Sequence, residues 1–324
     1  MLLAAASIII GFIILIWSAD LFVAGAASIA ENLGMSPILI GLTIVSLGTS
    51  APEILVSLTA ALAGSGVLAV GNAIGSNIAN IALVLGTTVL VAPLMVQAGC
   101  MRREVPVLLI VTFGVGLLIR DGELSALDGW LMMGAMIGMI VHLARSHMYD
   151  DEILQEAQEE GLPHLPPVRA WLYFGFGLCL LIFSSRLLVW GAVLAASELG
   201  VSELVIGLTI VAIGTSLPEL AATVASAMRG HTEIALGNII GSNLFNLLAV
   251  MSIPGIVSAQ KLAPEVLSRD YLTMTFLTVF LALAIIVSRK RSKSSAGHSY
   301  LGRTLGTLLV SFYGLYYYLL HSTL

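Results

Sequence analysis

Charged side chains are scarce in this sequence. Lys, Arg, Asp and Glu make up only 10% of the 324 residues, whereas hydrophobic residues make up 58% and the mean hydropathy is +1.01. A soluble globular protein of this length needs far more polar surface than such a composition supplies. The composition therefore excludes a soluble fold and predicts a protein that lies in a lipid bilayer.

Cysteines are rare, and the common catalytic motifs are missing. Cys100 and Cys179 lack the spacing of a disulfide framework or of a zinc site. There is no HExxH motif and no repeated pair of nucleophile and base, which argues against an intramembrane enzyme. We therefore expect no cofactor, no enzymatic activity and no binding of nucleic acid.

Long apolar stretches are abundant. Each has the roughly 18 to 25 residues that a helix needs to cross a hydrocarbon core of ~30 Å. The sequence predicts an all-α membrane protein whose ten transmembrane helices lie at 3–30, 37–62, 68–91, 104–119, 126–145, 168–197, 203–228, 233–257, 270–288 and 303–321.

One hydrophilic connector of appreciable length divides the chain. It predicts three parts: a first five-helix unit at 1–145, an acidic linker at 146–167 and a second five-helix unit at 168–324. The linker lacks the pattern of a helix-loop-helix calcium site, so we interpret it as a solvated cytoplasmic loop. With the amino terminus outside, the inner loops carry ten Lys and Arg residues and the outer loops three. This split predicts that both termini lie outside the cytoplasm.

The two halves repeat one another. A shift of 166 residues places GLTIVSLGTSAPE (41–53) on GLTIVAIGTSLPE (207–219) with ten of thirteen positions identical, and GNAIGSNIAN (71–80) on GNIIGSNLFN (237–246) with seven of ten. Each copy contains five predicted spans, and an odd number forces the second copy to enter the membrane from the opposite side. The sequence therefore predicts two inverted five-helix repeats, related by a pseudo-two-fold axis in the membrane plane.

The first repeated motif carries an acid into the membrane. Glu53 and Glu219 occupy equivalent positions inside apolar stretches, where a charge costs at least ~2.5–3.5 kcal/mol. A cation shared between them would offset that cost. The alternative is that Ser50 and Ser216, three residues before each acid, form capping boxes with it at the start of a helix.

Glycine and proline surround each acid. A glycine and a proline interrupt each apolar helix just before its acid. They are Gly48 and Pro52 before Glu53, and Gly214 and Pro218 before Glu219. Such a break frees backbone carbonyls, which is tolerated in a membrane only where they are buried or line a cavity. We expect a broken helix at each site.

The second repeated motif places polar side chains on one helix face. Asn72, Ser76 and Asn80 follow one another at intervals of four, and Asn238, Ser242 and Asn246 repeat the pattern. For Asn72 and Asn238 the alternative is a role as interhelical hydrogen-bond partners only. Oxygen donors without His or Cys suit Ca²⁺ and Na⁺ and do not suit zinc or copper.

Together these motif pairs closely resemble the two alpha-repeats of the sodium/calcium exchanger family, within the wider cation/calcium antiporters. The resemblance implies a ten-helix bundle with alternating access, in which the first and sixth spans move against the other eight. It also implies that Glu53 and Glu219 ligate the cation, and the implied set around them is Thr49, Ser50, Thr215, Ser216, Ser76, Ser242, Asn80 and Asn246, with the carbonyls of Ser46 and Ala212. At Asn246 the sequence departs from the family, because many sodium-dependent members carry Asp there.

The resulting hypothesis is a secondary antiporter that exchanges Ca²⁺ for Na⁺ across a bacterial inner (plasma) membrane and acts as a monomer. Exchange of Ca²⁺ for H⁺, or of another divalent cation, is the alternative, since Glu53 and Glu219 could bind protons in place of Na⁺. A passive channel would fit a polar path through the membrane, but it does not explain the inverted duplication of broken helices.

A third acid also lies in an apolar stretch. The 166-residue shift carries Asp20 of the first span onto Arg186 of the sixth. We expect a mid-membrane ion pair between them that ties these two spans together. The alternative is that each side chain reaches the interface or water separately.

Overall fold

The computed structural model describes residues 2–96, 98–148, 165–199, 212–291 and 299–322. Within them the chain is mostly helical, as predicted for an all-α membrane protein. Most of the predicted linker 146–167 and the first part of the predicted span 203–228 lie outside the described residues.

The described residues of the first half form ten helical elements, several of which follow one another without a loop. They are α1 (Leu2–Leu33), α2 (Pro37–Ile40), η1 (Gly41–Val45), α3 (Ser46–Thr49), α4 (Ala51–Leu62), α5 (Gly66–Ala79), η2 (Asn80–Leu85), α6 (Gly86–Val91), α7 (Ala98–Leu118) and α8 (Ala126–Met148). The elements η1 and η2 are π-helical.

The second half repeats this order over the residues that are described. Its helical elements are α10 (Pro167–Glu198), α12 (Ala212–Thr215), α13 (Leu217–Met228), α14 (Thr232–Phe245), η4 (Asn246–Val250), α15 (Ser252–Val257), η5 (Val266–Tyr271), α16 (Leu272–Arg291) and α17 (Arg303–Ser322).

Six of the described helices are long and apolar enough to cross a membrane. They are Leu2–Leu33, Gly66–Val91, Ala126–Leu143, Pro167–Ala196, Thr232–Val257 and Val266–Ser288. A seventh span is added if Ile38–Thr49 and Ala51–Leu62, which meet at an angle of 46°, count as one broken helix. The protein is therefore a multi-span helical membrane protein.

Two helices begin earlier than their apolar stretches indicate. Helix α7 begins at Ala98, six residues before the predicted start, so Arg102 and Arg103 lie in its first turns and not in a loop. Arg269 likewise lies within η5, ahead of α16. A helix satisfies its own backbone hydrogen bonds, so it can continue past the edge of the hydrocarbon core into the polar interface.

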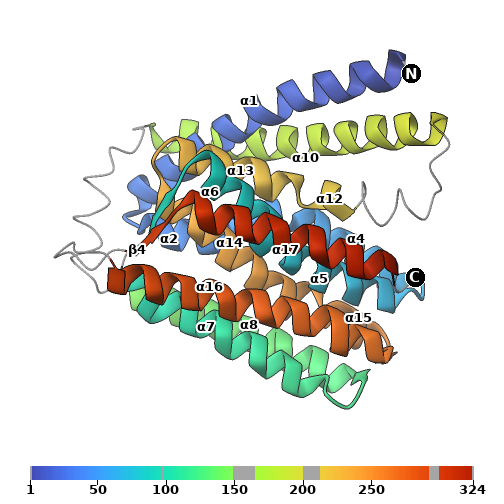
Figure 1. Cartoon of the computed structure of the whole chain (residues 1–324). Coiled ribbons are helices and arrows are strands. Elements are labelled where there is room, and N and C mark those ends of the chain that lie inside the picture. Colours follow the sequence, from blue (N-terminus) through green and yellow to red (C-terminus); the bar gives the residue numbers. More distant parts are fainter. Residues whose placement is uncertain (1, 97, 149–164, 200–211, 292–298, 323–324) are drawn as a thin grey trace.

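Helices α1 and α10 lie side by side at one edge of the molecule (Figure 1). They run antiparallel, because Gly11 lies opposite Leu188 whereas Gly25 lies opposite Phe174. Glycines from both helices line the contact, with Gly177 against Phe22 and Gly191 against Ser7. Small residues let two helix backbones approach closely, which is how helices associate in a membrane.

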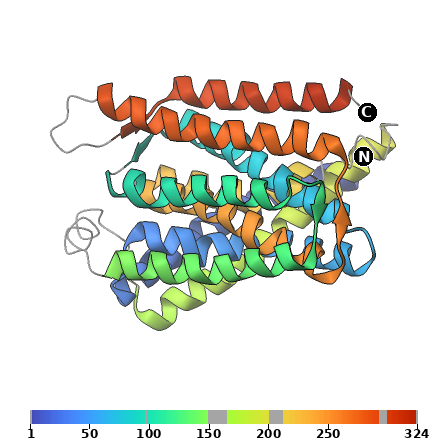
Figure 2. The same cartoon turned by 90° about the horizontal axis from the view of Figure 1, so that it is seen from below.

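The other helices form the body of the molecule. Helices α7, α8 and α16 lie on the side far from α1 and α10 (Figure 1), and α16 runs beside α17 in the view of Figure 2. The largest buried apolar cluster belongs to this body, and a smaller one fills the space between α1, α10 and the neighbouring helices.

Two short antiparallel strand pairs, which the sequence did not predict, connect the two halves. Strand β1 (Leu94–Val96) pairs with β4 (Ser299–Leu301), with Met95 opposite Tyr300. Strand β2 (Glu123–Leu124) pairs with β3 (Gln260–Lys261), with Glu123 opposite Lys261. Each pair takes one strand from each half, so main-chain hydrogen bonds join the halves at two places.

The glycine contacts give a first prediction. In Gly177→Ala the new Cβ would lie 2.6 Å from the backbone nitrogen of Phe22, so α1 and α10 must separate. Overpacking of this kind costs about 1–3 kcal/mol, and we expect a lower melting temperature of the purified protein in detergent. Gly175→Ala is the matched control, because a Cβ there meets no described atom within 4 Å and Ala favours a helix by up to ~1 kcal/mol over Gly. Equal melting temperatures for the two variants would contradict the proposed packing.

Candidate functional site

Each repeat contains a helix break at the predicted position. Ser50 separates α3 from α4 with φ −82° and ψ 4°, and Ser216 separates α12 from α13 with φ −89° and ψ 5°. Pro52 and Pro218 lie in the first turn of the helices that follow. Because the two breaks share their backbone geometry as well as their sequence, the predicted pair of broken helices is confirmed.

The prolines change the hydrogen bonding of the preceding turn. A proline has no N–H to donate to the carbonyl four residues earlier, and for Pro218 that carbonyl belongs to Gly214. The hydroxyl of Ser185 in α10 donates to the Gly214 oxygen at 3.0 Å. In the first repeat, the Ser46 carbonyl accepts the backbone N–H of Ser50 at 2.9 Å and the hydroxyl of Thr49 at 3.3 Å.

Both motif acids are buried at the start of the helix after the break. Glu53 is 1% exposed and Glu219 is 2% exposed. The hydroxyl of Ser50 donates to Oε1 of Glu219 at 3.1 Å, which brings the two breaks together across the repeats. The positive end of each helix dipole favours a carboxylate in this place.

Neither serine forms a capping box. The side chains of Ser50 and Ser216 make no hydrogen bond to the first turns of α4 and α13. Ser50 bonds to the acid of the other repeat, and the Ser216 hydroxyl has no hydrogen-bond partner among the described residues. Capping alone therefore does not explain why an acid follows each serine.

Several buried polar atoms around the breaks have no hydrogen-bond partner within the described part of the chain. Leaving such an atom unpaired costs about 1–3 kcal/mol and more for a charged group, so these groups need a partner such as an ordered water or a bound ion. They are Oε2 of Glu53, Oε2 of Glu219, the hydroxyls of Ser216 and Ser242, and both amide atoms of Asn80 and Asn246.

The two asparagines at the end of the second motif occupy equivalent places. Asn80 begins η2 and Asn246 begins η4, so each opens a π-helical turn in the middle of a span. Such turns occur frequently at functional sites because they shift the register of the helix. No group of three His, Cys, Asp or Glu residues that could hold a metal occurs among the described residues. Among the described residues, no third acid, His or Cys therefore joins Glu53 and Glu219.

The asparagines at the start of the motif hold helices together. Asn238 accepts a hydrogen bond from the hydroxyl of Thr49 at 3.1 Å and donates to the hydroxyl of Thr223 at 2.9 Å. Its equivalent Asn72 donates to the backbone oxygen of Glu53 at 3.3 Å. Both residues therefore make interhelical hydrogen bonds, as the alternative interpretation requires.

Sequence reasoning missed two residues of the second repeated motif, Asn77 and Asn243, which lie on a neighbouring face of the helix. The amide of Asn77 donates to the backbone oxygen of Asn243, its equivalent in the other repeat, at 3.2 Å. Two equivalent residues can touch only near the axis that relates them. Both asparagines belong to the repeated motif, and their identity in the two copies was the available signal.

The predicted pair of Asp20 and Arg186 is wrong. Asp20 instead accepts a hydrogen bond from Nε of Arg229, just after α13, at 2.9 Å. The Asp20 side chain is 51% exposed and that of Arg229 is 35% exposed. An exposed pair of this kind contributes at most ~1 kcal/mol.

The antiparallel contact explains the error. Gly11 lies opposite Leu188 and Gly177 lies opposite Phe22, so the residue of α10 that is level with Asp20 is Cys179. Arg186 lies seven residues further along α10, which is about 10 Å at a rise of 1.5 Å per residue. Equivalent residues of α1 and α10 are level only near Trp17 and Phe183.

A helical membrane protein in which each half brings one buried carboxylate to a broken helix has the design of an ion antiporter and not of an enzyme. The chain belongs to the sodium/calcium exchanger family, since it matches the family described as "Sodium/calcium exchanger protein" over residues 3–144 and 169–321.

Individual relatives agree with this assignment. The chain is 44% identical to "Putative antiporter CaxA" of Alkalimonas amylolytica over 100% of both chains. It is 39% identical to "Inner membrane protein YrbG" of Escherichia coli (strain K12) over 87% of this chain and 89% of that one. A solved structure of the sodium-calcium exchanger NCX_Mj matches with a TM-score of 0.81 and 28% identity over 97% of each chain.

The hydrogen bonds of the two motif asparagines give a second prediction. Asn238→Ala leaves the hydroxyls of Thr49 and Thr223 without this partner in a buried place, and a buried group left unsatisfied costs about 1–3 kcal/mol. The equivalent change Asn72→Ala removes a single bond to a backbone oxygen. We expect the larger loss of thermal stability in Asn238→Ala. Equal losses would show that the bonds of Asn238 contribute little.

Proposed function

We propose that the protein is a secondary active antiporter that exchanges Ca²⁺ for Na⁺ by alternating access. The observation that carries the proposal is the pair of buried carboxylates, Glu53 and Glu219, each with one oxygen left without a partner where the two broken helices meet. A buried charge without a counter-ion is very costly. A cation held between the two acids removes that cost.

The proposed ligand set combines these two charges with neutral oxygens. Oxygen ligands in a flexible arrangement suit Ca²⁺ and Na⁺. Around Glu53 and Glu219 we place Thr49, Ser50, Ser76, Asn80, Thr215, Ser216, Ser242 and Asn246, with the backbone oxygens of Ser46 and Ala212. Four of the neutral side chains in this set are buried, which supports this placement: Ser76, Ser242, Asn80 and Asn246.

The charge of the site limits what it carries. Two carboxylates balance one Ca²⁺ or two Na⁺, and a third Na⁺ must bind to neutral oxygens only. Asn246 supplies an amide where many family members carry Asp, so this chain has one acid fewer for the coupling ion. Exchange of Ca²⁺ for H⁺ is therefore the second candidate.

We place the site in a ten-span bundle of two inverted repeats, with residues 1–145 and 168–324 as the repeats and both termini outside the cytoplasm. The antiparallel contact of α1 with α10 and the contact of Asn77 with Asn243 support the inversion.

Helix α7 is not among the six long apolar helices because three charged residues lie in its first turns: Arg102, Arg103 and Glu104. Helix α17 carries four tyrosines that lower its hydropathy. The name of the Escherichia coli relative supports an inner-membrane location, and the monomer suffices for the proposed site.

Alternating access requires two states in which the halves of the site differ. The hydroxyl of Ser50 in the first repeat bonds to Glu219, but the equivalent hydroxyl of Ser216 makes no bond to a described residue. The second repeat therefore does not reproduce this contact, although its sequence is the same at these positions. Such asymmetry between identical motifs supports a transporter that exchanges the two arrangements.

A third prediction tests the two acids. Glu53→Gln and Glu219→Gln each remove one of the two charges, so we expect both to abolish Ca²⁺ uptake into proteoliposomes while the protein is still inserted and elutes as a single species. Glu123→Gln is the control, because Glu123 is exposed on β2 away from the breaks. Near-normal uptake by either site variant would refute the assignment of the site.

A fourth prediction tests the coupling ion. Liposomes loaded with Na⁺ should accumulate Ca²⁺ when the outside lacks Na⁺, and collapse of a pH gradient should leave this uptake unchanged. If one Ca²⁺ exchanges for three Na⁺, each cycle moves one charge, worth ~2.3 kcal/mol per 100 mV, and an imposed potential should change the rate. Uptake driven by a pH gradient alone would favour H⁺ as the coupling ion.

A further inference from the structure

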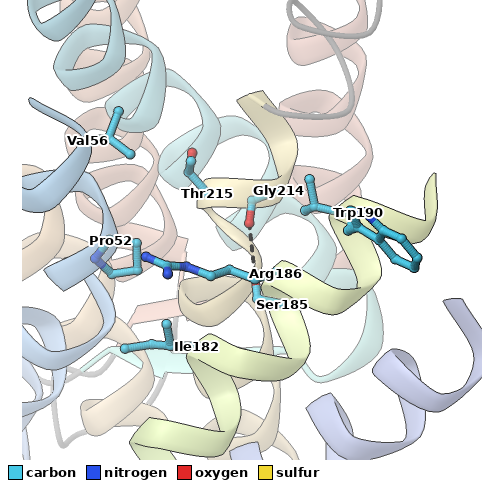
Figure 3. Close-up of a pocket in the computed structure, with 9 residues that line it drawn as sticks. Pro52, Val56, Ile182, Ser185, Arg186, Trp190, Gly214 and Thr215 are labelled. Carbon is cyan, nitrogen blue, oxygen red and sulfur yellow. Dashed lines mark hydrogen bonds between the residues drawn. The ribbon is translucent and has the colours of Figure 1, made fainter. Parts of the chain in front are cut away.

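A cavity of about 260 Å³ lies beside the two helix breaks. Pro52 and Val56 of α4 form one wall, residues of α10 form another, and Gly214 and Thr215 of α12 border it (Figure 3). Pro52 and Thr215 are the chain neighbours of Glu53 and Ser216, so the cavity reaches the edge of the proposed cation site. A cation that approaches the site from this side passes through the cavity.

Arg186 of α10 projects into this cavity. Figure 3 shows its guanidinium directed toward Pro52, next to the first break. Among the described residues no carboxylate forms an ion pair with Arg186, and Asp20 pairs with Arg229 instead. The other side chains around it, Ile182, Val189 and Trp190, are mainly apolar. A charge in the middle of a span is expensive and therefore points to a function.

We propose that Arg186 is a specificity-determining residue: a fixed positive charge in the route to the cation site that disfavours divalent cations relative to monovalent ones. This inference rests on the proposed function, because it assumes that cations reach Glu53 and Glu219 through the cavity. Arg186 ligates no ion in this scheme and acts only through its charge.

The electrostatics give the proposal a quantitative signature. The energy of an ion in the field of a fixed charge is proportional to the charge of the ion, so Ca²⁺ is repelled twice as strongly as Na⁺. Local ion concentration depends exponentially on this energy. If removal of the charge lowers the half-saturating concentration of Na⁺ by a given factor, it lowers that of Ca²⁺ by the square of this factor. An ion that passes ~10 Å from the guanidinium in a water-like medium would show about a 2-fold change for Na⁺ and about a 4-fold change for Ca²⁺.

The effect should occur at one membrane face only. The repeat places Asp20 of α1 at the position equivalent to Arg186 of α10, and Arg229 already balances the charge of Asp20. The equivalent position of the first repeat therefore carries a paired charge, so the field of Arg186 has no counterpart there among the described residues.

The experiment compares Arg186→Gln with Arg186→Lys, which keeps the charge. Initial rates of exchange are measured in proteoliposomes of known orientation, with Ca²⁺ and Na⁺ titrated separately at each face and at constant ionic strength. We expect Arg186→Gln to lower the half-saturating Ca²⁺ concentration by the square of its effect on Na⁺, at one face, with the maximal rate little changed. Arg186→Lys should resemble the unchanged protein, and higher ionic strength should reduce the difference. Arg120→Gln, in the exposed turn after α7, is the control for a general surface charge.

Three outcomes would overturn the inference while leaving the proposed function intact. Equal changes for Ca²⁺ and Na⁺ would exclude an electrostatic origin. A change in the maximal rate alone, or the same behaviour of the Lys and Gln variants, would assign Arg186 a packing role. The absence of ion exchange by the unchanged protein would instead refute the proposed function itself.

Discussion

The burial of two carboxylates within a membrane protein is the constraint on which the rest of the structure depends. Each of Glu53 and Glu219 follows a helix break and lies at the positive end of a helix dipole, which favours a buried carboxylate, and Glu219 also accepts a hydrogen bond from Ser50 of the other repeat. The prolines that create the breaks in turn leave carbonyls without their helical donors, and Ser185 compensates for one of these. One freed carbonyl is thus matched by a hydroxyl of another helix, whereas one oxygen of each acid has no partner among the described residues.

Much of this arrangement was predictable from sequence, because it is encoded by local motifs. Pro52 and Pro218 cannot continue a helix without a break. The repeated motifs alone therefore predicted the two breaks and the position of each acid. The capping alternative could be decided only in three dimensions, since Ser50 bonds to Glu219 in the other repeat. The short strand pairs were also not predictable, because two or three residues carry too weak a pattern and their partners are distant in the chain.

The error over Asp20 and Arg186 shows the limit of reasoning from a repeat. An internal duplication tells which residues are equivalent, but it does not tell where the symmetry axis passes. In the structure, equivalent residues of α1 and α10 are level only near Trp17 and Phe183. A few residues away from this level, Asp20 and Arg186 already lie about 10 Å apart along the helices. Asn77 and Asn243 lie on the axis and do touch. Contacts between equivalent residues are therefore informative about the axis only after the structure is known.

The glycine contacts between α1 and α10 have a mechanical consequence. Gly11, Gly25, Gly177 and Gly191 bring the two backbones together at successive levels, so neither helix can slip along the other without a steric clash. The two helices therefore behave as a single stiff rod, and no strand pair among the described residues fastens this rod to the body of the molecule. Any displacement of α1 along its axis is therefore passed on to α10, and any displacement of α10 is passed on to α1.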